Sequence, residues 1–193
     1  MVLSSEDFVS PVDLIATTTV FFGGEIDLDP ASSKNANQVV QAHKFFNWKH
    51  NGLNQSWKCK NLYLFPPRES LLKSEQPKPT TLFKKNLQYK KSAQCVWLEL
   101  CYHKWIRREF DQAIVLITST DVALLSTQRL GIDVPVCILK QKPKLLYDRE
   151  DLKPLKNNRV YGFVFYFPPV SDVDLNIRKF FETYSNLGRV YIQ

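Results

Sequence analysis

Apolar residues fall into blocks of two kinds along this chain, and polar or turn-forming residues separate the blocks. Short runs rich in β-branched and aromatic residues predict strands at residues 26–28, 61–65, 113–117, 134–139, 160–167 and 189–192. Longer blocks with apolar positions at helical spacing predict helices at residues 12–20, 34–46, 94–108, 122–129 and 174–184. Strands that alternate with helices are typical of βαβ units, so we expect an α/β fold with a mostly parallel sheet.

Local signals fix where some of these elements begin and end. Pro11 follows Ser10, and a proline at the first helical position after a serine N-cap favours a helix start. Gly131 follows the helix predicted at residues 122–129 and marks its end. Residues 71–91 carry two prolines, many lysines and weak periodicity, so we expect a mobile, basic, functional loop there.

Composition narrows the class of protein. The 193 residues suit a single domain over residues 1–193, and 44% hydrophobic residues exclude a disordered chain. A net charge of +7 favours anionic partners, nucleic acid first, although a basic solvated face is the other interpretation. The sequence has no signal peptide and no apolar stretch of membrane-spanning length, so we expect a soluble, cytoplasmic protein with no membrane partner.

The residues that usually bind metals do not form a recognisable motif. The four cysteines fit neither a zinc motif nor a disulfide framework, and free thiols are expected for Cys59, Cys95, Cys101 and Cys137. The three histidines are scattered, so neither a metal site nor a Ser/His nucleophile is expected.

Candidate chemistry gathers at two strand ends. The first predicted strand runs into Asp29-Pro30-Ala31, and the second ends at Pro66-Pro67. Ligands of open α/β sheets bind beyond the carboxyl ends of the strands, where a carboxylate can accept hydrogen bonds from ribose hydroxyls or an amino group. Asp27 alternates with Asp29, and the sequence leaves open which of them faces a site. A simple cap after a strand is the alternative role for Asp29.

A series of motifs carries a resemblance to a known family. In order they are Phe8-Val9-Ser10-Pro11, Asp29-Pro30-Ala31-Ser32-Ser33, Asn51-Gly52-Leu53, Trp57 and Phe65-Pro66-Pro67-Arg68. This order resembles the phage-type DNA adenine methyltransferase family. The resemblance implies a Rossmann-like methyltransferase fold with a mostly parallel central sheet and helices on both faces. It also implies S-adenosylmethionine as cofactor, DNA as partner, and cofactor contacts at Ser10, Pro11, Asp29, Pro30 and Ala31, with Asp121 as a further pocket candidate.

One motif departs from the family pattern. The family carries Asn/Asp-Pro-Pro-Tyr, in which the first side chain and a prolyl carbonyl accept hydrogen bonds from the target amino group and the aromatic ring stacks on the flipped base. Here Phe65 offers no acceptor and Arg68 only donors, although a guanidinium can stack on a base. The departure predicts impaired or absent catalysis, with Pro66 as the remaining acceptor and Pro67 completing the turn. Phe65 is otherwise a buried aromatic, and Arg68 a solvated or phosphate-facing charge.

Basic residues mixed with aromatics indicate a nucleic-acid surface. The first group is Lys84, Lys85, Lys90 and Lys91, beside Phe83 and Tyr89. Two further basic groups are Lys104, Arg107 and Arg108 at a helix end, and Lys140, Lys142 and Lys144. The sequence therefore supports a DNA adenine methyltransferase family protein with an impaired site. The alternatives are a non-enzymatic nucleic-acid- or protein-binding module on the same fold, and methylation of another substrate.

Overall fold

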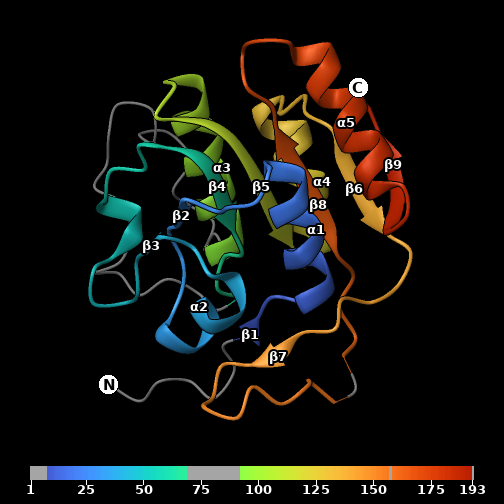
Figure 1. Ribbon diagram of the computed structural model, residues 1–193. Helices are drawn as coiled ribbons and strands as arrows, with labels where there is room; N and C mark the ends of the chain where they lie inside the picture. The colour runs from blue at the N-terminus through green and yellow to red at the C-terminus, as the bar shows by residue number, and fades with distance from the viewer. Residues whose placement is uncertain (1–7, 69–91, 157, 193) are drawn as a thin grey trace.

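The computed structural model describes residues 8–68, 92–156 and 158–192, and Figure 1 shows their arrangement. The helices are α1 (Val12–Phe22), α2 (Lys34–Val40), α3 (Ala93–Ile106), α4 (Thr120–Leu130) and α5 (Val173–Tyr184), with one short 3-10 turn, η1 (Gly52–Asn54). The strands are β1 (Phe8–Val9), β2 (Leu28–Asp29), β3 (Lys44–Phe45), β4 (Cys59–Leu64), β5 (Phe110–Ile117), β6 (Val136–Leu139), β7 (Leu146–Tyr147), β8 (Phe163–Phe167) and β9 (Gly188–Tyr191).

The main sheet has seven strands in the order β3-β2-β4-β5-β8-β6-β9. One half is parallel, because β2 pairs in parallel with β3 and β4, and β4 with β5. The other half is antiparallel, because β8 runs opposite to both β5 and β6, and β9 runs opposite to β6. The α/β class is therefore confirmed, and the sheet is only partly parallel.

Helices cover both faces of this sheet, and alternate residues of the central strands pack under them (Figure 1). Leu62 and Leu64 of β4 join one buried cluster with residues of α3 and α4. Tyr63, between them, joins a second cluster with residues of α1 and α5. This is the period of two expected of a strand buried on both sides.

Two local predictions fail for physical reasons. The helix predicted at residues 34–46 ends at Val40, because Gln41 adopts a left-handed conformation (φ 53°). The Asn37 side chain then bonds both the backbone N–H and the carbonyl of Ala42, which pins the turn into β3. Ser10 does not cap α1, since Pro11 holds the N-cap position and no side chain caps this end.

A two-stranded antiparallel ribbon, β1–β7, accompanies the main sheet and lies below it in Figure 1. Phe8 is opposite Tyr147 and Val9 is opposite Leu146. The Asp148 carboxylate accepts a hydrogen bond from the Ser33 hydroxyl at 2.9 Å, which ties the ribbon to the start of α2. The ribbon therefore lies beside the edge at which β2 and β4 end.

Candidate functional site

The two strand ends singled out by the sequence meet at one edge of the sheet. Leu28 of β2 pairs in parallel with Leu62 of β4, so both strands point the same way. Asp29 closes β2, and Pro66 follows the end of β4. The prediction that Asp29 and Pro66 share a rim is confirmed.

Asp29 is the residue of this edge whose electrostatics are most unusual. Its side chain is buried, with 2% of the residue exposed, and its Oδ1 accepts a hydrogen bond from the Ala31 N–H at 3.1 Å. Burial raises the pKa of Asp29 from 3.8 to about 7, against a smaller lowering by the Ala31 N–H and the neighbouring Ser32 hydroxyl. The carboxyl group is thus poised between its two protonation states near neutral pH.

Asp27 has a structural role instead. Its Oδ2 accepts hydrogen bonds from the N–H groups of Lys60 and Asn61, at 3.0 Å and 2.7 Å. These bonds hold the chain before β2 against β4. Asp27 is thus engaged with the backbone of β4, while the Asp29 Oδ1 accepts one backbone hydrogen bond, so Asp29 stays the candidate site carboxylate.

Two buried side-chain polar atoms of the described residues have no hydrogen bond of normal geometry, the Ser32 hydroxyl and the Trp97 indole N–H. The Ser32 hydroxyl nevertheless lies close enough to the Asp29 carboxyl to lower its pKa. The Trp97 ring packs against Gly52, where an added Cβ would overlap the Pro30 carbonyl oxygen.

Ser10 and Tyr63 close the same edge from the side of α1. The Tyr63 hydroxyl donates to the Ser10 Oγ at 2.8 Å, and both groups are buried. Burial raises the pKa of Tyr63 well above its usual value, so the phenol stays neutral. Ser10 therefore joins the edge through Tyr63, and Pro11 follows it directly.

The tetrapeptide after β4 has the character of a packed strand end. Phe65 is 7% exposed and belongs to the core between the sheet, α1 and α5. The Pro66 carbonyl accepts a long hydrogen bond, 3.4 Å, from the Gln94 Nε2. Pro67 is half-buried and Arg68 exposed. The Arg68 Cζ lies 5.5 Å from the Phe8 ring centre.

Gln94 is a residue that sequence reasoning missed. Its Nε2 also donates to the Thr118 hydroxyl at 2.9 Å, and its Oε1 accepts from the N–H groups of Thr118 and Ser119. Gln94 thereby links the ends of β4 and β5. The available signal was a glutamine in the first turn of a helix whose neighbouring positions are apolar.

The structure describes only some of the basic residues, and those residues lie in different environments. Lys84, Lys85, Lys90 and Lys91 lie outside the described residues, as does the whole of the loop predicted at residues 71–91. Lys104 is buried and bonded to Glu109 Oε2 at 2.6 Å and to the Gln55 carbonyl, which gives it a structural role at the end of α3 rather than a place on a partner surface. Asp121 is exposed in the first turn of α4, which Ser119 caps.

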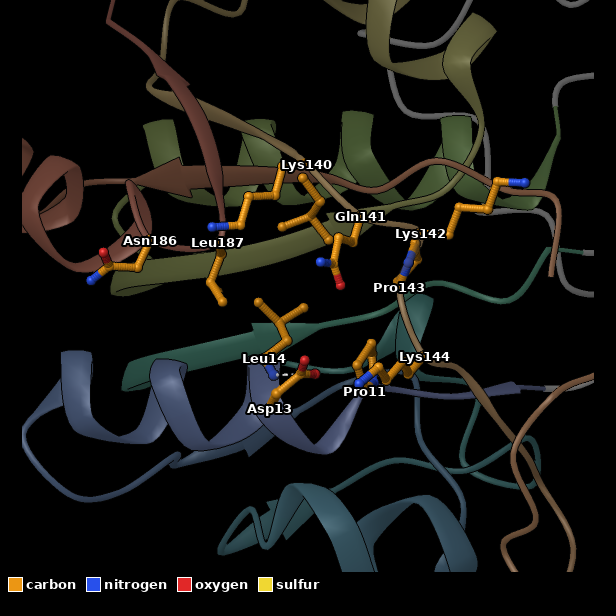
Figure 2. A pocket seen from close by; sticks show the side chains of 11 residues that line it. Pro11, Asp13, Leu14, Lys140, Gln141, Lys142, Pro143, Lys144, Asn186 and Leu187 are labelled. Carbon is orange, nitrogen blue, oxygen red and sulfur yellow. Dashed lines mark hydrogen bonds between the residues drawn. The ribbon is translucent and has the colours of Figure 1, made fainter.

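Lys140, Lys142 and Lys144 line a cavity of about 110 Å³ together with Pro11 and Leu187. Figure 2 shows them on the segment after β6, which lies opposite the start of α1, with the Lys142 side chain pointing away from that helix. Pro11 is the one residue that this cavity shares with the predicted cofactor contacts. Its volume is below the roughly 300–1,000 Å³ of small-molecule pockets. The buried carboxyl of Asp29, with the Ser32 hydroxyl beside it, is the stronger candidate for a site, because it carries a titratable group.

Further features of the described residues bear on the class of protein. Cys59, Cys101 and Cys137 are free thiols, and burial raises the pKa of Cys59 and of Cys137 to about 12. Within residues 8–68, 92–156 and 158–192, His, Cys, Asp and Glu form no group of three that could hold a metal ion. The helices of these ranges are all too short or too polar to cross a membrane.

No protein-family model matches the sequence, and comparisons with curated proteins and with solved structures returned no significant match. The argument for function therefore rests on the residues of the site.

Proposed function

We propose that this chain is a methyltransferase-like protein that keeps a binding site for S-adenosylmethionine and has lost most of its capacity to methylate adenine in DNA. The observation that carries the proposal is Asp29, a buried carboxyl at the end of a parallel strand. The motif order noted above gives the proposal its family, and the α/β fold agrees with a Rossmann-like methyltransferase.

The polar groups around Asp29 fit that ligand in chemistry. An ionised Asp29 accepts hydrogen bonds from hydroxyl or ammonium groups, and the neighbouring Ser32 hydroxyl can both donate and accept. Pro30 and Ala31 form the turn that presents them, and Gly52 lets the Pro30 carbonyl approach closely. S-adenosylmethionine would supply an electrophilic methyl group.

The end of β4 supports the loss of catalysis. An amino nitrogen conjugated to a purine is a poor nucleophile until acceptors hold its protons. Phe65 supplies none, and the Pro66 carbonyl already accepts from Gln94. Removing one positioned polar group at a reacting centre costs roughly two to three decades in rate.

Calorimetric titration with S-adenosylmethionine tests the binding half of the proposal. We expect the unmodified protein to bind, and Asp29→Asn to bind at least tenfold more weakly, because a neutral amide accepts weaker hydrogen bonds than a carboxylate. Asp111→Asn is the matched control, since Asp111 is an exposed carboxylate at the start of β5, at the opposite end of the strands, and should leave affinity unchanged. Equal affinities for both variants would remove Asp29 from the site.

Transfer of a labelled methyl group to DNA tests the catalytic half. The unmodified protein should transfer slowly or not at all, and Phe65→Asn combined with Arg68→Tyr should raise the rate by restoring the acceptor and the stacking ring. Burying Asn in place of Phe costs about 3 kcal/mol of stability, so the assay is run where circular dichroism shows the variant folded. Phe65→Leu, which adds no acceptor, is the control. Fast methylation by the unmodified protein would contradict the role given to Phe65.

A non-enzymatic binding module is the second candidate, because Phe65 packs in the core and the Pro66 carbonyl already accepts a hydrogen bond from Gln94. The same calorimetry separates the two, since a module that has lost the cofactor site gives no heat with S-adenosylmethionine.

A further inference from the structure

One face of the β1–β7 ribbon carries two aromatic rings between two guanidinium groups. Phe8 and Tyr147 are directly opposite each other in the ribbon, with ring centres 6.1 Å apart and planes inclined at 48°. The Arg68 Cζ lies 5.5 Å from the Phe8 ring centre, and the Arg149 Cζ lies 5.0 Å from that of Tyr147. We call these four side chains the ribbon face. Both rings are half-buried and both arginines are exposed.

The core accounts for only part of this composition. Phe8 packs partly against the buried cluster that includes residues of α1 and α5, whereas Tyr147 belongs to neither buried cluster. Successive strand residues point to opposite sides, and Val9, next to Phe8, is the buried residue of β1, with 1% exposed. Tyr and Arg share a planar surface on which a nucleobase can stack.

Positive charge also lies on the chain segment before β7. Lys144 is three residues from Tyr147 along the chain, as Pro11 is from Phe8, which is about 10 Å if extended, and both line the cavity that holds Lys140 and Lys142. All three lysines are exposed. Among the nearby carboxylates, Asp148 bonds to Ser33, Asp151 to Lys153 and Asp13 to the Leu14 N–H, and Glu150, next to Arg149, is exposed.

We propose that the ribbon face is a stacking surface for unpaired bases of a single-stranded nucleic acid whose phosphates lie along Lys140, Lys142 and Lys144. Aromatic rings that receive bases beside a cationic track are the general means of binding single strands. A duplex hides the faces of its bases, so it cannot use the rings. The inference goes beyond the proposed function, because it needs neither S-adenosylmethionine nor methyl transfer.

Fluorescence anisotropy with three labelled probes of equal length tests the proposal: an oligothymidylate, an abasic strand and a duplex. The full chain should bind the oligothymidylate most tightly, because the abasic strand offers phosphates without bases. An abasic strand bound as tightly, or a duplex bound more tightly, overturns the proposal.

Variants then separate stacking from charge. Tyr147→Ala should weaken oligothymidylate binding by about 5- to 150-fold without changing the salt slope, while Tyr147→Phe keeps the ring and the affinity. Lys142→Ala with Lys144→Ala should lower the slope of log affinity against log salt by about 1.4. Tyr161→Ala removes an exposed tyrosine outside the ribbon face and should change nothing.

If Tyr147→Ala does not fold, Arg149→Lys gives the same information, because it keeps the charge and removes the plane. It should weaken binding several-fold at an unchanged salt slope. Unchanged affinity in a folded Tyr147→Ala or in Arg149→Lys overturns the stacking role. Calorimetry with S-adenosylmethionine is independent of these results, so loss of the cofactor site and loss of strand binding are told apart.

Discussion

The replacement of Asp29 by Asn should make the protein more stable at neutral pH, and the gain should disappear in acid. The ordinary pKa of an aspartate, 3.8, applies to the unfolded chain, and burial raises it to about 7 in the folded protein. Below pH 4 both states hold the proton. Between pH 4 and pH 7 the unfolded chain releases it first, so stability falls as pH rises through this window.

The size of the effect follows from the shift. A change from 3.8 to about 7 corresponds to roughly 4 kcal/mol of unfolding free energy above pH 7. Asparagine is nearly isosteric, and its oxygen can still accept from the Ala31 N–H, so the variant escapes the cost of ionisation without losing that bond. For a chain of this length the gain corresponds to roughly 8–16 °C in Tm.

Urea unfolding of the two proteins at half-unit steps between pH 4 and pH 8 measures the difference directly. Other titrating groups are common to both proteins and cancel in the comparison. We expect a difference near zero at pH 4 that grows steadily to its full value at pH 7–8. Parallel profiles across this range would falsify the argument, because they would mean that Asp29 has the same pKa in the folded and the unfolded chain.

Two further substitutions test packing around the site. Gly52→Ala should cost about 1–3 kcal/mol in urea unfolding, because the new Cβ would overlap the Pro30 carbonyl oxygen and crowd Trp97; an unchanged midpoint would show that this close approach is not required. Lys104→Met should cost about 2 kcal/mol, since it leaves Glu109 and the Gln55 carbonyl without their partner. The control is Arg107→Met on the same helix end, where the side chain is exposed and the change should stay within about 0.5 kcal/mol; equal losses would refute a special role for Lys104.

The sequence predicted the buried strands well and the sheet direction poorly. The runs at residues 113–117 and 160–167 are dense in β-formers, and both hold central strands, β5 and β8. A strand buried on both faces has the same composition whichever way it runs, so nothing in residues 160–167 indicated that β8 opposes β5. The two-residue strands β1, β3 and β7 are too short for any periodicity to appear.

The sequence located those parts of the site in which a motif fixes the backbone. It did not predict the hydrogen-bond partners of individual side chains. Asp-Pro after an apolar run located the end of β2. The choice between Asp27 and Asp29 depended on the amide groups of Lys60 and Asn61, which are more than 30 residues away. Ser10 matched a helix cap by type, yet its hydroxyl bonds to Tyr63. Contacts at such sequence separations leave no local signal.

The residues at the two strand ends of the candidate site differ in how well they suit a buried core. This contrast agrees with the proposal of retained cofactor binding and impaired catalysis. At the end of β4, the side chain that removes the acceptor, Phe65, adds a buried aromatic to the core, and Gln94 satisfies the Pro66 carbonyl. At the end of β2, the Asp29 carboxyl is buried, although burial disfavours its ionised form, and the Ser32 hydroxyl lies beside it. Proteins keep such locally unfavourable groups chiefly where function requires them. On the proposed function, Asp29 stays buried where an amide would be more stable because the cofactor needs a carboxylate, so the edge at β2 is where ligand binding should be tested first.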